Sequence, residues 1–201
     1  MNVYQIHWRD SINIHINDPC WEQSEPLRLI YGWAGSTQPE TTAAMFWNQN
    51  GIVVRFRSSE HPVTVRYRNH NDPVNRDSCV EIFLNPNELE DNRYLNFELN
   101  AAGLMHLQFG DEVSREDIVD VDFRIFHIQT RISDSGWDAK LVIPFSFLRR
   151  YYAALLSEWR INLYKCGDRT THPHYLCWAK IPTEKPNFHQ SKYFGRVCFE
   201  R

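Results

Sequence analysis

Aromatic rings and polar side chains alternate through the last quarter of the chain, in segments 159–168 and 174–200. In a strand, such alternation places the rings and the polar groups on opposite faces of a sheet. A tryptophan beside amide, carboxylate and imidazole groups suits a sugar, which is apolar on its C–H faces and carries hydroxyls around its rim. The same pattern is also typical of an aromatic β core, because aromatic side chains are commonly buried. Both interpretations are open at this point.

Two glutamates, Glu81 and Glu98, lie on consecutive predicted strands and could be cross-strand neighbours. Glycoside hydrolysis requires two carboxyl groups that face each other across a cleft. A buried glutamate is more often a hydrogen-bonded structural group, or an acceptor for a sugar hydroxyl, than a general acid. Because 25 of the 201 residues are acidic, such pairs arise easily, and hydrolysis stays the alternative to binding.

Cys166, His172, His174 and Cys177 could bring together two thiols and two imidazoles, the ligand types that zinc prefers. Their spacing is irregular for a zinc site, and cysteines on a hairpin can instead point into the core as small apolar groups. The chain has five cysteines, an odd number without a repeated short spacing. We therefore expect reduced, mostly buried thiols rather than a disulfide framework.

Three acidic loops, 72–77, 88–91 and 117–122, offer oxygen ligands of the kind that calcium accepts. None has the EF-hand spacing, and solvated acidic loops are the alternative. Structural calcium is thus a candidate without an identified ligand set, and no other cofactor is predicted.

The composition argues against several classes of partner. The net charge is −3 and no broad basic cluster occurs, which excludes the electrostatic footprint of a nucleic-acid-binding protein. No stretch approaches the roughly 20 apolar residues of a membrane-spanning helix. Phosphate-loop, dinucleotide-binding, nucleophile-elbow and HExxH motifs are all missing. Localisation and oligomeric state stay open, although the lack of a visible signal peptide favours the cytoplasm.

Short alternating runs separated by turns predict an all-β protein with an antiparallel β-sandwich. One short helix is expected around 145–157, after a proline suited to a first turn. Without repeats or linkers, the chain is predicted to form one domain over 1–201, in which 1–38 is the least patterned segment. Its first 25 residues could wrap the outside or close the sheet against the C-terminal strand. The predicted strands span 27–31, 41–48, 52–57, 63–68, 79–84, 94–100, 104–109, 122–132, 137–143, 159–166 and 194–200.

Six sequence blocks follow one another in order within the part of the chain from about residue 39 to the end. They are NRDSCVEIFLNP (75–86), YLNFELNAAG (94–103), WDAKLVIPFSFL (137–148), NLYKCGD (162–168), PHYLCW (173–178) and PNFHQSKYFGRVCFE (186–200). The ordered series resembles the carbohydrate-binding module family 9-like proteins, and among them the single-domain bacterial members.

This resemblance implies a jelly-roll-like sandwich related to DOMON domains, without catalytic activity and often with structural calcium. In the xylan-linked modules of that family, two tryptophans sandwich a terminal sugar, while a glutamate and amide or basic groups bind its hydroxyls. Matching block by block, the resemblance assigns the glutamate to Glu81, the amide to Asn100 and one tryptophan to Trp178. His189, in the last block, is either a contact at the rim of the site or a hydrogen bond that fixes a loop.

The chain departs from the family pattern near Asn75, where the second tryptophan is expected and none occurs. A single ring excludes water from only one face of a sugar, so weaker binding, a different sugar or loss of binding all follow as options. Tyr67, Trp47 or Tyr175 could supply the second ring.

The predicted function is therefore binding of a mono- or oligosaccharide without transforming it. Trp178 is expected to stack on the sugar, with Glu81, Asn100, His189 and Tyr67 as further ligand-binding residues. A core position for Trp178 is equally compatible with the sequence. The alternatives are a glycan-acting hydrolase with paired carboxylates, and a structural or partner-binding sandwich whose sugar site is lost.

Overall fold

The computed structural model describes residues 2–33 and 38–201. Most of the chain in these ranges forms strands, whose alternating side chains bury one face of each sheet. The strands are β1 (Val3–Trp8), β2 (Leu27–Arg28), β3 (Tyr31–Gly32), β4 (Thr41–Asn48), β5 (Gly51–Ser58), β6 (Cys79–Asn85), β7 (Tyr94–Asn100), β8 (Met105–Gly110), β9 (Arg115–Asp117), β10 (Gln129–Ser133), β11 (Gly136–Pro144), β12 (Glu158–Cys166), β13 (Tyr175–Cys177) and β14 (Gly195–Glu200).

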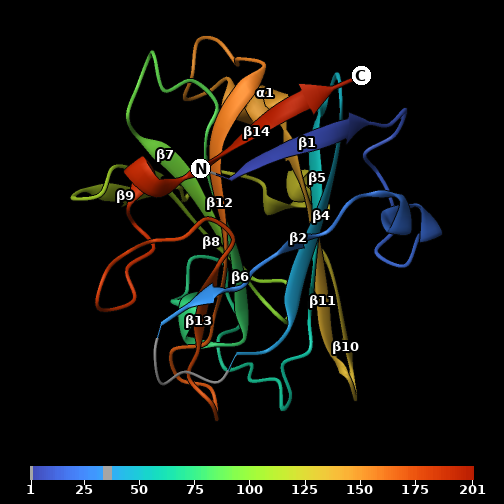
Figure 1. Cartoon of the computed structure of the whole chain (residues 1–201), viewed down its shortest axis with the longest axis vertical. Helices are drawn as coiled ribbons and strands as arrows, with labels where there is room; N and C mark the ends of the chain where they lie inside the picture. Colours follow the sequence, from blue (N-terminus) through green and yellow to red (C-terminus); the bar gives the residue numbers. More distant parts are fainter. Residues whose placement is uncertain (1, 34–37) are drawn as a thin grey trace.

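Hydrogen bonds connect the strands in the order β10-β11-β5-β4-β1-β14-β12-β6-β7-β8-β9. The short strands β2, β3 and β13 pair beside this path, β2 with β4 and β13 with both β12 and β3. Figure 1 shows the two layers, with β4, β5, β10 and β11 on one side and β6, β7, β8 and β12 on the other. The predicted antiparallel β-sandwich is confirmed, apart from β1, which pairs in parallel with β14 and β4.

The strand β1 connects the two layers. It lies between β14 and β4, so the N-terminal segment closes the sheet against the C-terminal strand, one of the two arrangements left open by the sequence. Its inward side chains Tyr4 and Ile6 are buried in the main core.

The main core lies between the layers and takes every second residue of each long strand. On β6 these are Val80, Ile82 and Leu84, and on β7 they are Leu95, Phe97 and Leu99. The intervening residues, among them Glu81 on β6 and Glu98 on β7, therefore stand on the opposite face of the same strands.

The helical segments are short. The helix α1 (Phe145–Leu148) lies within the predicted range 145–157 but ends much earlier. Beyond it, the backbone N–H groups of Ala153 and Ala154 donate to the Glu90 carboxylate, and these bonds hold the chain against the 86–93 loop instead of continuing a helix. The 3₁₀ segments are η1 (Pro19–Gln23), η2 (Val74–Arg76), η3 (Phe123–Phe126) and η4 (Ser191–Tyr193). No helix of the described residues is long and apolar enough to cross a membrane.

The predicted strand 63–68 is wrong. The backbone there is extended, but side chains take its hydrogen bonds, because the Asp77 carboxylate accepts from the N–H groups of Arg66 and Tyr67. The Ser78 hydroxyl accepts from the N–H of Thr64 in the same way. The predicted run 122–132 also divides, into η3 and β10, and the run 27–31 divides into β2 and the start of β3.

Candidate functional site

Aromatic side chains of the C-terminal segment pack on the outer face of β6, β7 and β12. Phe83, Tyr94, Tyr164 and Phe194 form a second aromatic cluster there, and partly buried Phe188 packs against it. The C-terminal segment leaves a hollow where β6 and β12 reach Cys79 and Cys166.

This hollow has a volume of about 200 Å³. It is smaller than the roughly 300–1,000 Å³ of pockets for drug-sized ligands, and its size suits a single small polar ring. Its floor and walls are mostly acidic, amide and aromatic side chains. The lining residues are Asn75, Glu81, Glu98, Cys166, Asp168, Tyr175, Pro186, Asn187, Phe188 and His189.

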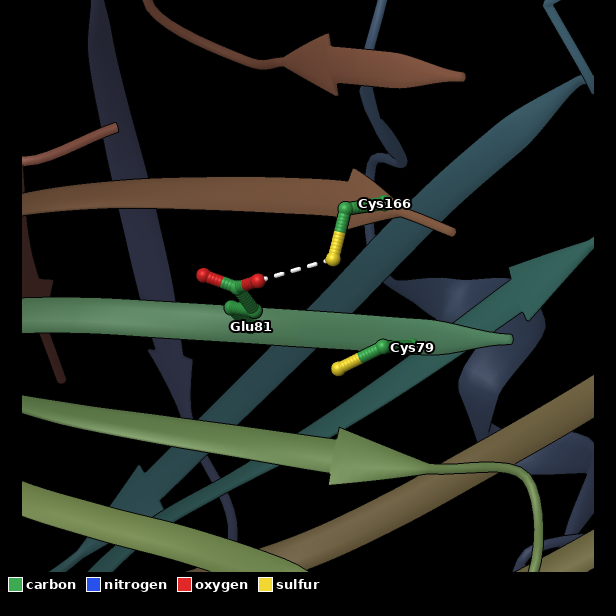
Figure 2. A group of neighbouring side chains, drawn as sticks. All are labelled: Cys79, Glu81 and Cys166. Carbon is green, nitrogen blue, oxygen red and sulfur yellow. Dashed lines mark hydrogen bonds between the residues drawn. The ribbon is translucent and has the colours of Figure 1, made fainter. Parts of the chain in front are cut away.

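Glu81 lies at the floor and is only 3% exposed. The Cys166 thiol donates a hydrogen bond to its Oε1 at 2.9 Å, as Figure 2 shows. Burial, together with the nearby Cys166 and Glu98, raises the pKa of Glu81 well above its ordinary value. The carboxyl group therefore favours its protonated form, which can both donate and accept hydrogen bonds.

Asp168 and Asn75 form the neighbouring wall. The Asn75 Nδ2 donates to Asp168 Oδ2 at 3.1 Å. Burial also raises the pKa of Asp168. With Glu98, which pairs directly opposite Glu81 across β6 and β7, the pocket carries three carboxyl groups.

Two partly exposed rings, Tyr175 and Phe188, stand at the pocket. Their centroids lie 6.3 Å apart with an interplanar angle of 70°, so they form a corner rather than two parallel walls. Phe188 is held in place because its ring stacks on Tyr164 at 4.2 Å and its carbonyl accepts a hydrogen bond from the Tyr164 hydroxyl. Burial raises the pKa of Tyr175 to about 12, so its phenol is neutral.

His189 lines the pocket and also fixes the loop that carries it. Its Nδ1 lies 2.8 Å from the Tyr94 hydroxyl, and its ring packs on Phe83 at 4.9 Å. Burial lowers the pKa of His189 to about 3, so the imidazole is neutral. The two roles that the sequence offered for this residue are thus compatible.

Trp178 does not offer an exposed platform, contrary to the expectation from the resemblance. Its side chain is 7% exposed and belongs to the main core with Leu176, Ala179 and Val197. A Cβ atom placed on Gly195 would lie 2.4 Å from the indole ring, which shows how closely the backbone covers it. The physical reason is the strand period, because Trp178 lies two residues after Leu176 and shares its inward side.

Asn100 is fully buried and outside the pocket. Its Nδ2 donates to Asp77 Oδ2 and to the Tyr67 carbonyl, and its Oδ1 accepts from the N–H groups of Ala102 and Leu104. All its hydrogen-bonding atoms have partners within the chain, so the structure assigns it to the turn after β7.

The two other aromatic candidates also lie elsewhere. Tyr67 packs beside Val74 and does not line the pocket. The Trp47 Nε1 donates to the Glu200 carbonyl, and its ring packs on Trp8 and Phe199. Of the three rings considered as replacements for the missing tryptophan, Tyr175 lines the pocket. Asn75, near which that tryptophan was expected, also lines the pocket.

The four residues that the sequence offered as possible zinc ligands do not gather around one point, in agreement with the preferred interpretation of buried thiols. The His174 Nε2 lies 2.7 Å from the Lys165 ammonium, and its Nδ1 lies 2.7 Å from the His172 carbonyl. The Cys177 thiol points to the Tyr31 carbonyl. All five cysteines are free thiols, as expected. Structural calcium stays a prediction.

A larger hollow of about 520 Å³ lies on the other layer. Of its three arginines, Arg28, Arg57 and Arg131, the last two are paired with Asp138, at 3.3 and 2.7 Å. None of the blocks that carry the family's sugar-binding residues contributes a free polar group there. We therefore regard the smaller acidic pocket as the candidate site.

Sequence reasoning found Glu81 and His189 and missed other members of the site. Asp168 closes the NLYKCGD block and Phe188 lies in the PNFHQ block, so both were visible as polar or aromatic residues at block ends. The sequence did not predict that the side chains of Asp168 and Phe188 point into the pocket, because their positions depend on how the C-terminal loop folds back over β12.

The comparisons with known proteins agree with this architecture. The model of Carbohydrate-binding family 9 matches residues 30–199. A candidate carbohydrate-binding protein from Bacteroides uniformis superposes with a TM-score of 0.84 at 24% identity, covering 98% of this chain and 99% of that one. No curated protein matched the sequence.

Two further similar structures are family 9 modules from Caldicellulosiruptor kristjanssonii. The complex with cellotriose has a TM-score of 0.69 at 14% identity and covers 99% of this chain and 94% of that one. The complex with glucose has a TM-score of 0.70 at 13% identity and covers 99% and 96%. At these identities the structures support the fold, while the family match spans most of the sequence. The chain belongs to carbohydrate-binding family 9.

Proposed function

We propose that the acidic pocket binds a single sugar residue and does not transform it. The observation that carries this proposal is the nearly buried Glu81 carboxyl at the floor of an open hollow, with Tyr175 and Phe188 at its side. Membership of a carbohydrate-binding, non-catalytic family supports binding as the activity. The family modules bound to glucose and cellotriose make a hexose the first ligand to test.

The chemistry of the lining fits such a ligand. A sugar hydroxyl donates one hydrogen bond and accepts others. Protonated carboxyl groups and amides can both donate to it and accept from it. Glu81, Glu98 and Asp168 supply the carboxyls, and Asn75 supplies the amide. The two rings cover apolar C–H groups of the sugar, as aromatic side chains do in small-molecule sites.

The charge of the pocket predicts which sugars bind. Its lining contains three carboxyl groups and neither lysine nor arginine. A uronate would have to bury its carboxylate here without a lysine or arginine of the lining to pair with it, and burial of an unpaired charge is costly. We therefore expect neutral hexoses to bind better than the corresponding uronates.

Hydrolysis is the less favoured alternative, for a geometric reason. Glu81 and Glu98 are directly opposite each other on neighbouring antiparallel strands, so their side chains leave the sheet side by side. A glycosidase needs its two carboxyl groups on either side of the scissile bond. Absence of reducing-sugar release from oligosaccharides, with binding retained, would agree with the binding assignment.

The direct test is calorimetric titration of the protein with glucose and glucuronate. Glu81→Gln keeps the size of the side chain but replaces a carboxyl O–H, which can donate and accept, with an amide NH2 that can only donate, so we expect glucose to bind roughly 10-fold more weakly or worse. Glu25→Gln, at an exposed position next to β2 and outside the pocket lining, is the matched control. If Glu81→Gln and the unmodified protein bound glucose with equal affinity, the proposal that this pocket binds the sugar would be contradicted.

A further inference from the structure

Two cysteines and a glutamate converge at the floor of the pocket. Cys79 and Cys166 are paired directly across the antiparallel strands β6 and β12. Glu81 follows Cys79 by two residues and so stands on the same face. One ligand atom from each of the three side chains lies within 4.8 Å of the other two, and all three residues are buried. Figure 2 shows both thiols turned toward the carboxyl group.

We propose that Cys79, Glu81 and Cys166 bind a zinc ion. Zinc takes thiolate sulfur at about 2.3 Å and carboxylate oxygen at about 2.0–2.2 Å in a tetrahedral arrangement, which separates the ligand atoms by roughly 3.5–3.8 Å. The existing separations reach this arrangement with side-chain shifts of about 1 Å. The proposal concerns the metal alone and does not depend on sugar binding.

The ligand types select the metal. Calcium and magnesium prefer oxygen ligands, whereas thiolates favour zinc and other soft or borderline ions. Three protein ligands leave a fourth position, which water or a further carboxylate can fill. Glu98 and Asp168 line the same pocket and offer such oxygens.

The pocket also provides a route for the ion. Glu81 and Cys166 both line it, and Cys79 lies behind them with no exposed surface. An ion that enters the pocket therefore meets two of its three ligands first.

Binding of a cation at this place displaces protons from its ligands. Burial raises the pKa of Cys79 to about 11 and also raises the pKa of Cys166 and of Glu81 well above their ordinary values. Without a metal these groups keep their protons, and zinc would replace them on binding. Disulfide formation is disfavoured for the same reason, because the attacking species is the thiolate, which is scarce at a raised pKa.

The test uses the full chain, reduced, in a Cys20→Ser/Cys198→Ser background that removes the two partly exposed thiols. Cobalt(II) serves as a spectroscopic probe, because thiolate ligands give it a strong charge-transfer band, and zinc titration by calorimetry gives the stoichiometry. We expect one ion per chain. Cys79→Ser and Cys166→Ser should each weaken zinc binding by at least roughly 100-fold, since even outer partners of metal ligands contribute about 10–100-fold.

Cys177→Ser is the matched control, because Cys177 is equally buried but donates to the Tyr31 carbonyl away from the cluster. Its zinc affinity should equal that of the background protein. The proposal is overturned if the thiolate–cobalt band is absent in the background protein, or if Cys79→Ser or Cys166→Ser binds zinc as tightly as the background protein.

A second measurement covers the case in which the serine variants fold poorly. Zinc that binds only the folded chain raises its melting temperature. Glu81→Gln retains both thiols and a neutral group of similar shape, so it should keep the cobalt band but bind zinc at least about 10-fold more weakly. Unchanged zinc affinity in Glu81→Gln would contradict the proposed ligand set, whatever its effect on glucose.

Discussion

Burial makes Glu81 a different chemical group from the exposed glutamates of the chain. Its neighbours are a thiol and a second carboxyl, and no cation pairs with it among the described residues. A buried carboxyl without a paired cation keeps its proton, and this gives the pocket a donor as well as acceptors. The same position makes it sensitive to whatever enters the pocket, a sugar hydroxyl or a metal ion.

At the scale of single residues, Trp178→Ala is expected to destabilise the fold rather than abolish sugar contacts. The indole is buried against Leu176 and Val197, and truncation of a buried aromatic side chain costs about 3–5 kcal/mol. Urea unfolding measures the loss directly. If the variant kept its stability but no longer bound glucose, Trp178 would be a sugar-binding residue and the core assignment would be wrong.

The sequence predicted which types of side chain occur at the candidate site, but it did not predict correctly which way each side chain points. Glu81 lines the candidate pocket, because the alternation of β6 fixes its face once Val80 and Ile82 are buried. Trp178 could have been assigned to the core from Leu176 by the same period. Tyr175, three residues earlier, then takes the opposite face, which is where the pocket lies.

At the scale of elements, one histidine connects three strands at the edge of the layer. His106 on β8 lies 3.4 Å from Glu98 on β7 and 2.8 Å from Asp117 on β9. Although burial opposes its charged form, these two carboxylates raise the pKa of His106 to about 9. The charged imidazolium therefore stabilises this edge.

This arrangement predicts a pH-dependent contribution to stability. Because the folded pKa lies above the unfolded value of about 6.5, the contribution is fully present below pH 6.5 and is lost as the pH rises toward 9. The stability difference between the unmodified protein and His106→Gln should shrink over this window, by on the order of 3 kcal/mol. Urea unfolding at pH 6 and 9.5 measures it, with exposed His172→Gln as the control. A difference independent of pH would contradict the assignment.

The long central strands could be predicted, whereas the extended segment held by side chains was wrongly predicted as a strand. β6, β7, β11 and β12 follow the alternating apolar pattern closely. The extended segment 63–68 has the same pattern, but its N–H groups bind Asp77 and Ser78. No local sequence signal reveals such a distant side-chain partner.

At the scale of the whole molecule, the least patterned segment completes the sandwich. Among the described strands, β1 is the one that pairs with both β14 and β4, and it lies outside the family match over residues 30–199. The sandwich itself could be predicted from the alternating runs. Closure by β1 could only be named as one of two options, because a single short strand carries no information about its partners.

A fragment that starts at residue 30 is therefore expected to lose cooperative folding. It would expose the edges of β4 and β14 and lose the buried side chains Tyr4, Ile6 and Trp21. Near-ultraviolet circular dichroism and urea unfolding of fragment 30–201 and the full chain measure this. The same unfolding midpoint in both would show that the matched segment folds without its N-terminal strand.

The central claim is that the acidic pocket over β6, β7 and β12 holds the sugar. A crystal structure of the chain with glucose tests it most directly. The account predicts one sugar ring against the Glu81 carboxyl, with Tyr175 and Phe188 at its apolar face. Glucose bound instead in the larger hollow around Arg57 and Trp137, with the acidic pocket empty of sugar, would contradict it.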